Sequence, residues 1–267
     1  MSRGRAAQQA VAADERHTPP LASVLMPRRR GLRPRPLAAV VRSKATLAFA
    51  AERQVVRRAE TMRAYLADLI DRLTKDEPMV SSADSVSWAA HREAEQLRDV
   101  SMVEELVEAA ASDKAKPRRA ACYFVIGKIG GNLQDARCAR VLLDLLNTER
   151  DKHNIASILE RVAEIGKPST FDLSSVYALL EDPRWRVRHA AIQALRNSQG
   201  EEVEAHLLRH LASTDDPYDQ TYCHAVLNYL GTVRSIPLLE ANLKSRKRDV
   251  KLSAEAALRA IRSRGDV

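Results

Sequence analysis

One pattern of apolar and small residues recurs along the chain, and it constrains the fold more than any other feature. In its clearest copy, Val187, Ala191, Ala194 and Leu195 fall at three- and four-residue spacing. That spacing places an apolar stripe along one side of a helix. Further copies can be aligned from Arg118, Asn154, Tyr222 and Val250, and a weaker one from Ala89. The copies begin 28 to 36 residues apart, and a period near 30 is typical of stacked helical units.

Shorter leucine-rich segments alternate with these copies. Each has its own apolar side, as in RCARVLLDLLNTE, where Leu142 and Leu146 share a face. Charged or turn-forming residues follow each segment, such as Asp182-Pro183, in which Asp suits a helix cap and Pro suits a first helical turn. The unit is therefore a helix, a tight turn, a second helix and a loop. With nine glycines and 4% aromatic residues, and without long alternating β-branched runs, the chain is expected to be all-α.

The segment Leu179–Leu195 reads LLEDPRWRVRHAAIQAL. Its leucine-rich helix, Asp-Pro turn and Val-Arg-x-x-Ala-Ala-x-x-Ala-Leu pattern resemble a HEAT repeat, most closely the short variety also found in phycobilisome linker lyases. The resemblance extends over about residues 84–267, although the copy from Asn154 lacks both the Val-Arg pair and a preceding Asp-Pro. It implies an α-α superhelix, a HEAT-like α-solenoid, of about five to six helical pairs.

The segment before the repeats divides into two parts. Residues 46–76 carry one apolar stripe and read as a long helix or a helix pair. We therefore expect N-terminal capping helices over 45–83, because a terminal repeat must cover the open edge of the core. Residues 1–44 are rich in Arg and Pro, and we expect them to form a disordered tail.

Positive charge is concentrated in that tail. Residues 1–44 contain ten of the 43 Lys and Arg residues but two of the 35 acidic residues. The rest of the chain is therefore balanced in charge, and the net charge of +8 does not indicate a basic folded surface. The tail has four alternative readings: attachment to nucleic acid or anionic lipid, twin-arginine export, an organellar transit peptide, or a translation start at Met26 or Met62.

The sequence contains no recognisable catalytic, metal-binding or cofactor-binding motif. His206 and His210 stand one turn apart and are expected on the exposed side of their helix, but Leu207 lies where a zinc-protease motif needs Glu. His189 and His224 occupy equivalent positions in adjacent copies. Iron-dependent hydroxylases built from HEAT repeats need His-Glu dipeptides, and none occurs here. HEAT-like DNA glycosylases need a cationic inner face, which the balanced charge does not favour. We therefore expect no metal, no cofactor and no enzymatic activity.

Cysteine and glycine positions support smaller expectations. Cys122, Cys138 and Cys223 lack CxxC spacing, which favours a reduced, cytoplasmic setting. No apolar run approaches the roughly 20 residues that span a bilayer. The three glycines between Gly127 and Gly131 follow apolar residues of one copy, and we expect them to end that helix.

The HEAT resemblance implies that the second helix of each unit lines the concave side. The positions expected to face solvent there carry mixed charges without a basic row, which suits a protein or peptide better than a phosphate backbone. Trp185, Tyr218 and Tyr222 lie near turns of adjacent copies and are candidate anchors, whereas Trp88 is expected in the core. The candidate partner-binding residues are Phe124, Lys128, Glu160, Glu164, Trp185, His189, Gln193, Arg196, Tyr218, Tyr222, His224 and Asn228.

The sequence therefore favours a non-enzymatic scaffold or adaptor that binds a protein or peptide along the concave face, and we expect this protein to be a monomer. Two alternatives remain. The first is a nucleic-acid-binding protein that uses the basic tail, and the second is a lyase-like chaperone, which the family resemblance alone suggests.

Overall fold

A computed structural model describes residues 37–78, 81 and 83–265, and this part of the chain confirms the all-α fold. It consists of twelve α-helices and three short 3-10 helices, with no strand among the described residues. The closest approach to β structure there is one isolated bridge between Lys167 and Ser198. No described helix is both long enough and apolar enough to cross a membrane.

The first helix, α1, spans Leu37–Leu73 without a break. It thus begins within the segment 1–44 that the sequence assigns to the tail, while residues 1–36 lie outside the described residues. The contacts of the chain divide it into two units, Met1–Glu52 and Arg53–Val267. The helices after α1 all belong to the second unit.

The weak copy that begins at Ala89 corresponds to α2, Val86–Ala94, which is followed by the 3-10 helix η1, Val100–Met102. Ala90 and Ala94 are the buried residues of α2. They lie on the side opposite Trp88, because residues two and six positions later on a helix point about 200° and 240° away. Trp88 is 52% exposed, so its expected place in the core is wrong.

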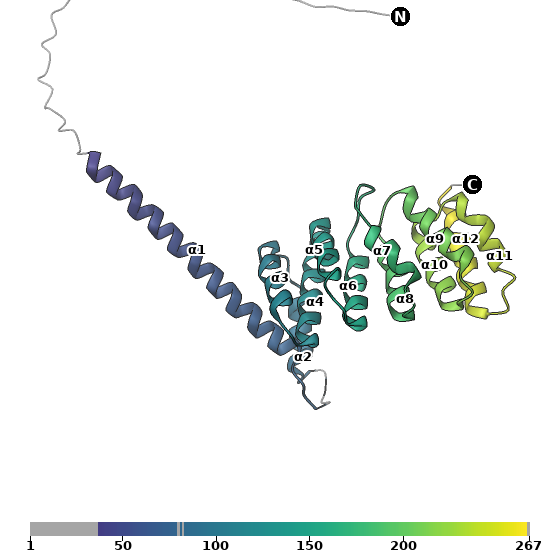
Figure 1. Cartoon of the computed structure of the whole chain (residues 1–267), viewed down its shortest axis with the longest axis horizontal. Coiled ribbons are helices and arrows are strands. Elements are labelled where there is room, and N and C mark those ends of the chain that lie inside the picture. Colours follow the sequence, from purple (N-terminus) through teal and green to yellow (C-terminus); the bar gives the residue numbers. More distant parts are fainter. Residues whose placement is uncertain (1–36, 79–80, 82, 266–267) are drawn as a thin grey trace, which may run out of the picture. The chain divides into compact units, whose positions relative to one another are not determined.

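Five helical pairs follow, and their second helices contain the five strong copies of the sequence pattern. Figure 1 shows the helices of these pairs in chain order from α3 to α12. The pairs are α3 Val103–Ser112 with α4 Lys116–Leu133; α5 Ala136–Leu146 with α6 Lys152–Glu164; α7 Ser174–Ala178 and η2 Leu179–Glu181 with α8 Trp185–Ala194; α9 Glu201–Ser213 with α10 Pro217–Leu230; and η3 Val233–Ser235 and α11 Ile236–Asn242 with α12 Arg248–Ser263.

The second helices form a continuous layer in which α4, α6, α8, α10 and α12 each contact the next. The first helices pack against this layer, for example α3 on α4 and α11 on α12. Both sides contribute fully buried apolar side chains to the core between them, such as Leu142 of α5 and Ile158 of α6. The small Ala190, Ala191 and Ala194 of α8 are also buried. The apolar face of each pair is therefore removed from water by its neighbours, as the repeat pattern requires.

The glycines of α4 serve close packing and do not end the helix. α4 continues through them to Leu133, and its C-cap is Gln134 in the left-handed conformation with φ of 51°. A Cβ atom at Gly127 would lie 2.5 Å from Cβ of Arg161, and one at Gly130 would lie 2.5 Å from Cβ of Cys138. Both separations are too short for real atoms, so the absence of a side chain allows α4 to approach α6 and α5. The expectation that these glycines end the helix is wrong.

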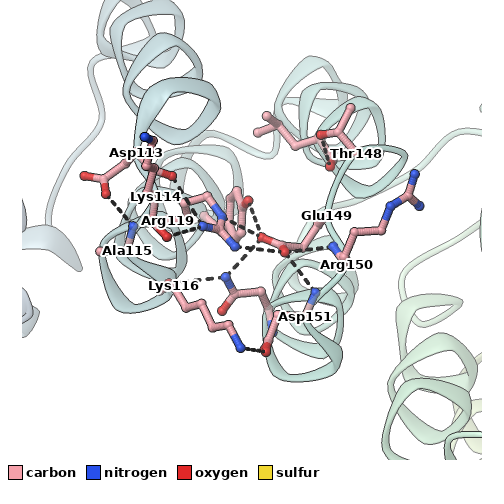
Figure 2. A network of polar contacts seen from close by, with 12 residues as sticks. Asp113, Lys114, Ala115, Lys116, Arg119, Thr148, Glu149, Arg150 and Asp151 are labelled. Carbon is pink, nitrogen blue, oxygen red and sulfur yellow. Dashed lines mark hydrogen bonds and ion pairs between the residues drawn. The ribbon is translucent and has the colours of Figure 1, made fainter.

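A buried polar network links α4 of the first pair to α6 of the second pair at their N-terminal ends (Figure 2). Glu149, in the turn before α6, accepts hydrogen bonds from Arg119 Nε at 2.9 Å and Tyr123 Oη at 2.9 Å, both on α4. It also accepts from Asn154 Nδ2 at 3.0 Å and from the amides of Arg150 and Asp151 at 2.8 and 3.0 Å. Burial alone would raise the pKa of Glu149, but these donors outweigh burial and hold it far below its ordinary value.

A buried lysine connects the next two pairs. Lys167 is 1% exposed, and its Nζ donates to the carbonyl oxygens of Val162 at 2.8 Å, Ile165 at 2.7 Å and Arg196 at 2.8 Å. These carbonyls lie at the C-terminal ends of α6 and α8, where a cation is favourable. Burial lowers the pKa of Lys167 to about 7.

Candidate functional site

Aromatic residues gather on two neighbouring second helices, α8 and α10. Trp185, His189 and Arg196 follow one another at intervals of four and seven residues, and Tyr218, Tyr222 and Tyr229 repeat the same intervals. Eleven residues correspond to three helical turns plus about 20°, so the three tyrosines form a row along one side of α10. Trp185 and His189 begin a matching row on α8, and Arg196 continues it in the turn that follows the end of α8 at Ala194. We call these six residues the aromatic stripe: Trp185, His189, Arg196, Tyr218, Tyr222 and Tyr229.

The two rows are in contact along their length. The ring of His189 lies 5.4 Å from that of Trp185, 6.1 Å from that of Tyr218 and 4.8 Å from that of Tyr222, measured between centroids. Farther along, the guanidinium carbon of Arg196 lies 4.7 Å from the ring centroid of Tyr229, a cation–π separation. Side chains of adjacent units thus meet at two places, around His189 and between Arg196 and Tyr229.

Most of the stripe is open to solvent. Trp185 is 60% exposed, Tyr218 67% and Tyr229 58%, Arg196 is exposed, and Tyr222 is half-buried. Large exposed aromatic side chains lying together are unusual on a surface that has no partner. The candidate anchors that lie together here are Trp185, Tyr218, Tyr222 and Arg196. Tyr229 belongs to the same surface, although the sequence analysis did not select it.

His189 differs from its expected position. It is only 7% exposed, so the prediction that it faces solvent is wrong. Its Nε2 lies 2.9 Å from Oδ1 of Asp219, a residue of α10 that is itself 1% exposed. Burial lowers the pKa of His189 despite the neighbouring carboxylate, which favours the neutral imidazole. The carboxylate on the neighbouring helix and the surrounding rings explain why this side chain turns inward.

Arg188 and His210 complete the charged cluster below the stripe. Arg188 donates from Nε to Asp219 Oδ2 at 2.5 Å and from Nη2 to Asp216 Oδ2 at 2.9 Å. His210 of α9 is 4% exposed, which corrects the expectation that it lies on the exposed side of its helix. Burial lowers its pKa, but the carboxylates of Asp219 and Glu181 outweigh burial and raise it. Within the described residues, His189, Asp216 and Asp219 form a group whose ligand atoms all lie within 4.8 Å of one another.

His224 has a separate, structural role. It is fully buried, so its expected exposure is also wrong. Its Nδ1 lies 2.9 Å from Ser253 Oγ on α12, and its Nε2 lies 2.8 Å from Asn242 Nδ2 at the end of α11. Burial lowers its pKa to about 4. Both ring nitrogens are thus engaged between two helices, and the equivalence of His189 and His224 in the repeat pattern does not bring them to one site.

The candidate residues on α4 and α6 form a second, more polar patch. The ring of Phe124 lies between Lys128 Nζ at 5.4 Å and the guanidinium carbon of Arg161 at 5.6 Å. Glu164 pairs with Lys128 Nζ at 3.2 Å and with Arg161 Nη1 at 2.7 Å. Glu160 is exposed beside them. The cations here already have carboxylate partners, so the patch offers little free positive charge.

The last two candidates, Gln193 and Asn228, are both half-buried. The backbone carbonyl of Asn228 accepts a hydrogen bond from Arg264 Nη1 at 2.6 Å. Neither side chain extends the aromatic stripe. Cys122, Cys138 and Cys223 are all buried and free, and burial raises the pKa of Cys122 to about 12, so none is placed as a reactive thiol.

The stripe lies within a segment that matches a known family. Residues 139–226 and 180–259 match the family model of HEAT repeats. The repeats of this segment are therefore similar to HEAT repeats. The two overlapping matches together include all six stripe residues, so the candidate site lies on the third and fourth helical pairs, within the matched segment.

The solved structures that are similar to the chain include three with low sequence identity. A designed armadillo repeat protein is 18% identical with a TM-score of 0.45, and the match covers 73% of this chain and 99% of that one. An engineered protein is also 18% identical, with a TM-score of 0.44 and coverage of 74% and 96%. Human deoxyhypusine hydroxylase in complex with glycerol is 15% identical, with a TM-score of 0.26 and coverage of 77% and 98%. No curated protein matches the sequence.

Proposed function

We propose that this HEAT-repeat array is a protein-interaction scaffold that binds a peptide segment of a partner protein along the aromatic stripe. The observation that carries the proposal is the exposure of Trp185 and Tyr218, 60% and 67%, on adjacent repeats around one shared histidine ring. Aromatic side chains supply large contact areas with few rotatable bonds, and they dominate the binding energy of many interfaces.

The size of the stripe suits a short peptide. Trp185 to Arg196 covers eleven residue steps, or about 16 Å at 1.5 Å per residue. An extended peptide advances about 3.3 Å per residue, so about five residues fit along this length. The apolar rings would cover side chains of the peptide, and the exposed guanidinium of Arg196 at one end supplies a polar contact.

The packing beneath the stripe favours binding without rearrangement. His189 is held among three rings and faces the buried Asp219, and Asp219 is fixed by Arg188. A preorganised surface loses less conformational entropy when a partner binds. This support is the reason why we choose the stripe over the patch around Phe124, whose charges are already paired with one another.

The charges of the described residues do not favour nucleic acid as the partner of this face. The cations Lys128 and Arg161 both pair with Glu164, and Arg188 pairs with Asp216 and Asp219. A groove that follows a phosphate backbone needs a succession of free cations. Binding of nucleic acid by the basic segment 1–44 is a separate hypothesis, and it predicts a steep salt dependence that deletion of this segment abolishes.

The proposal can be tested with peptides selected from a random display library on the full-length protein. Loss of one anchoring aromatic side chain typically costs about 2 kcal/mol of binding free energy or more, which is about 30-fold in affinity. We therefore expect the selected peptides to bind the Trp185→Ala and Tyr218→Ala variants at least about 30-fold more weakly than the wild type. Trp88→Ala is the matched control, since Trp88 is 52% exposed on α2 and lies outside the stripe.

Equal affinity for the wild type and both stripe variants would refute the proposed binding surface. So would selected peptides whose affinity falls only in the Trp88→Ala control. Circular dichroism of each variant shows whether the helical fold is retained, and the exposure of the substituted side chains makes retention the expected result.

A further inference from the structure

The charged cluster around Asp219 contains buried polar atoms that have no hydrogen-bond partner. Asp219 Oδ2 accepts from Arg188 Nε at 2.5 Å and from Thr214 Oγ1 at 3.1 Å. Its other oxygen, Oδ1, has no directed hydrogen-bond donor, and neither has His189 Nε2, although both atoms are buried and only 2.9 Å apart. A buried polar atom without a partner is costly. The two atoms therefore lie at ion-pair distance from each other without a well-directed hydrogen bond to either of them.

The remaining polar contacts hold a second carboxylate nearby, that of Asp216, which has an oxygen within 4.8 Å of both atoms. Asp216 accepts the amide hydrogen of Tyr218 at Oδ1, at 2.9 Å, and a hydrogen of Arg188 Nη2 at Oδ2, also at 2.9 Å. Arg188 therefore holds one oxygen of each carboxylate at the same time. Two carboxylates face one guanidinium, and the other nearby basic group is His210, whose Nε2 lies 3.4 Å from Asp219 Oδ2.

From this geometry we propose that His189 Nε2, Asp219 Oδ1 and one carboxylate oxygen of Asp216 bind a first-row divalent transition-metal ion. An imidazole nitrogen with two carboxylate oxygens is a donor set that suits Zn²⁺ and its neighbours in the series. Arg188 and Thr214 act as outer partners that fix the carboxylates, as such groups do around other metal sites. This inference does not depend on the proposed peptide binding.

The distances require the side chains to adjust before they can hold an ion, since the Asp216 oxygen lies within 4.8 Å of the other two ligand atoms and has to come closer to them. Bonds of about 2.0–2.1 Å place two tetrahedral ligands about 3.4 Å apart. The His189 and Asp219 atoms, now 2.9 Å apart, have to separate by about half an ångström to receive the ion. The side chain of Asp216 is 30% exposed, which gives the ion a route from solvent and leaves room for water ligands.

Bound metal would link α8 to α10 directly below the aromatic stripe. His189 contacts the rings of Trp185, Tyr218 and Tyr222, and a metal bond would fix its ring. The ion therefore has a structural role in this proposal, and no reaction is assigned to it.

The test is calorimetric titration of the chelator-treated, full-length protein with Zn²⁺ alone, supported by the absorption spectrum of added Co²⁺. We compare the wild type with His189→Gln and with Asp216→Asn, because Asn retains the helix-capping function of Asp216 while removing its charge. The matched control is His206→Gln, since His206 lies on α9 and stacks on Tyr177 with ring centroids 3.7 Å apart, away from the cluster.

We expect one equivalent of Zn²⁺ to bind the wild type and the His206→Gln control, with an affinity at least about tenfold lower in both site variants. The absence of a stoichiometric site in the wild type would overturn the proposal. Equal binding by the wild type, His189→Gln and Asp216→Asn would overturn it as well, because the ion would then be held elsewhere. Folding of each variant is verified by circular dichroism, and Asp216→Asn decides the question if His189→Gln does not fold.

Discussion

Replacement of Glu149 by Ala tests how the repeats are held together. The carboxylate is buried and accepts six hydrogen bonds, two of them from Arg119. Removing one partner of a buried ion pair costs about 3–5 kcal/mol, because the other charge is left uncompensated. Arg119 retains hydrogen bonds from Nη1 to the carbonyls of Asp113 and Lys114, so we expect a loss near the lower limit, about 3 kcal/mol.

The measurement is urea unfolding followed by far-ultraviolet circular dichroism at neutral pH. Glu160→Ala is the matched control, because Glu160 is an exposed glutamate on the adjoining helix α6, and its removal should change the free energy of unfolding by no more than about 0.5 kcal/mol. A loss below about 1 kcal/mol in Glu149→Ala would refute the reasoning, since it would fall within the range of an ordinary exposed ion pair.

The same residue predicts a pH dependence. The pKa of Glu149 is far below its ordinary value of 4.5, so the unfolded chain binds more protons than the folded chain as the pH falls through that value. Stability from this group is therefore present at neutral pH and is lost below about pH 5. We expect the Glu149→Gln variant to be less stable than the wild type at pH 7 and to lose less stability between about pH 5 and pH 3. Parallel pH profiles would contradict this.

Three further predictions concern two buried titratable side chains, Lys167 and His224, and the packing around the glycines of α4. Burial lowers the pKa of Lys167 from 10.5 to about 7, so between pH 7 and pH 10.5 the unfolded chain binds more protons than the folded chain. The stability of the wild type should therefore rise with pH in this window relative to that of Lys167→Met, as urea midpoints would show. Gly127→Ala should destabilise the protein by about 1–3 kcal/mol, because its Cβ would overlap the side chain of Arg161. Gly131→Ala should stabilise it by up to about 1 kcal/mol, because its Cβ would meet nothing nearer than 3.7 Å. A lower melting temperature for Gly131→Ala than for Gly127→Ala would contradict this account of the packing. His224, with a pKa lowered to about 4, should cause a loss of wild-type stability from about pH 6.5 to pH 4 that is smaller in His224→Gln.

The periodicity of the sequence was sufficient to predict the helical pairs. The spacing of Val187, Ala191 and Ala194 reports which side of a helix is apolar, and that side is buried whatever its neighbour is. Asp182-Pro183 marks the turn before α8 correctly, but it does not form the expected helix cap: α8 begins at Trp185, its N-cap is Arg184, and Asp182 Oδ1 accepts the amide hydrogen of Arg184 within the turn. These features depend on residues close together in the chain, so a single sequence contains the information for them.

The errors arose where long-range contacts decide the position of a side chain. His189 was expected at the surface because it lies off the apolar stripe, but Asp219, 30 residues later, provides a buried partner for it. Lys167 lies in a loop and gave no signal that its ammonium group joins the ends of two helices. Gly127 was expected to end its helix, because a glycine after apolar residues often does so. Its actual role is to let α4 approach Arg161 on another helix, and that distance cannot be read from neighbouring residues in the chain.

The candidate site was predicted in part. Trp185, Tyr218 and Tyr222 were selected from their positions near turns of adjacent copies, and the structure places them around one histidine. Tyr229 was missed, although its eleven-residue distance from Tyr218 was a readable signal that both lie on the same side of one helix. The group of His189, Asp216 and Asp219 could not be found from spacing within one helix, because its members come from two.

The most direct test of the proposed function is the fluorescence of Trp185 during titration with a selected peptide. The chain has two tryptophans, and the Trp88→Phe variant leaves Trp185 as the only one. Because Trp185 is 60% exposed in the free protein, we predict that its emission shifts to shorter wavelength as the peptide saturates and covers the ring. A peptide that binds with unchanged affinity but leaves the Trp185 emission at its initial wavelength would show that partners bind elsewhere on the array.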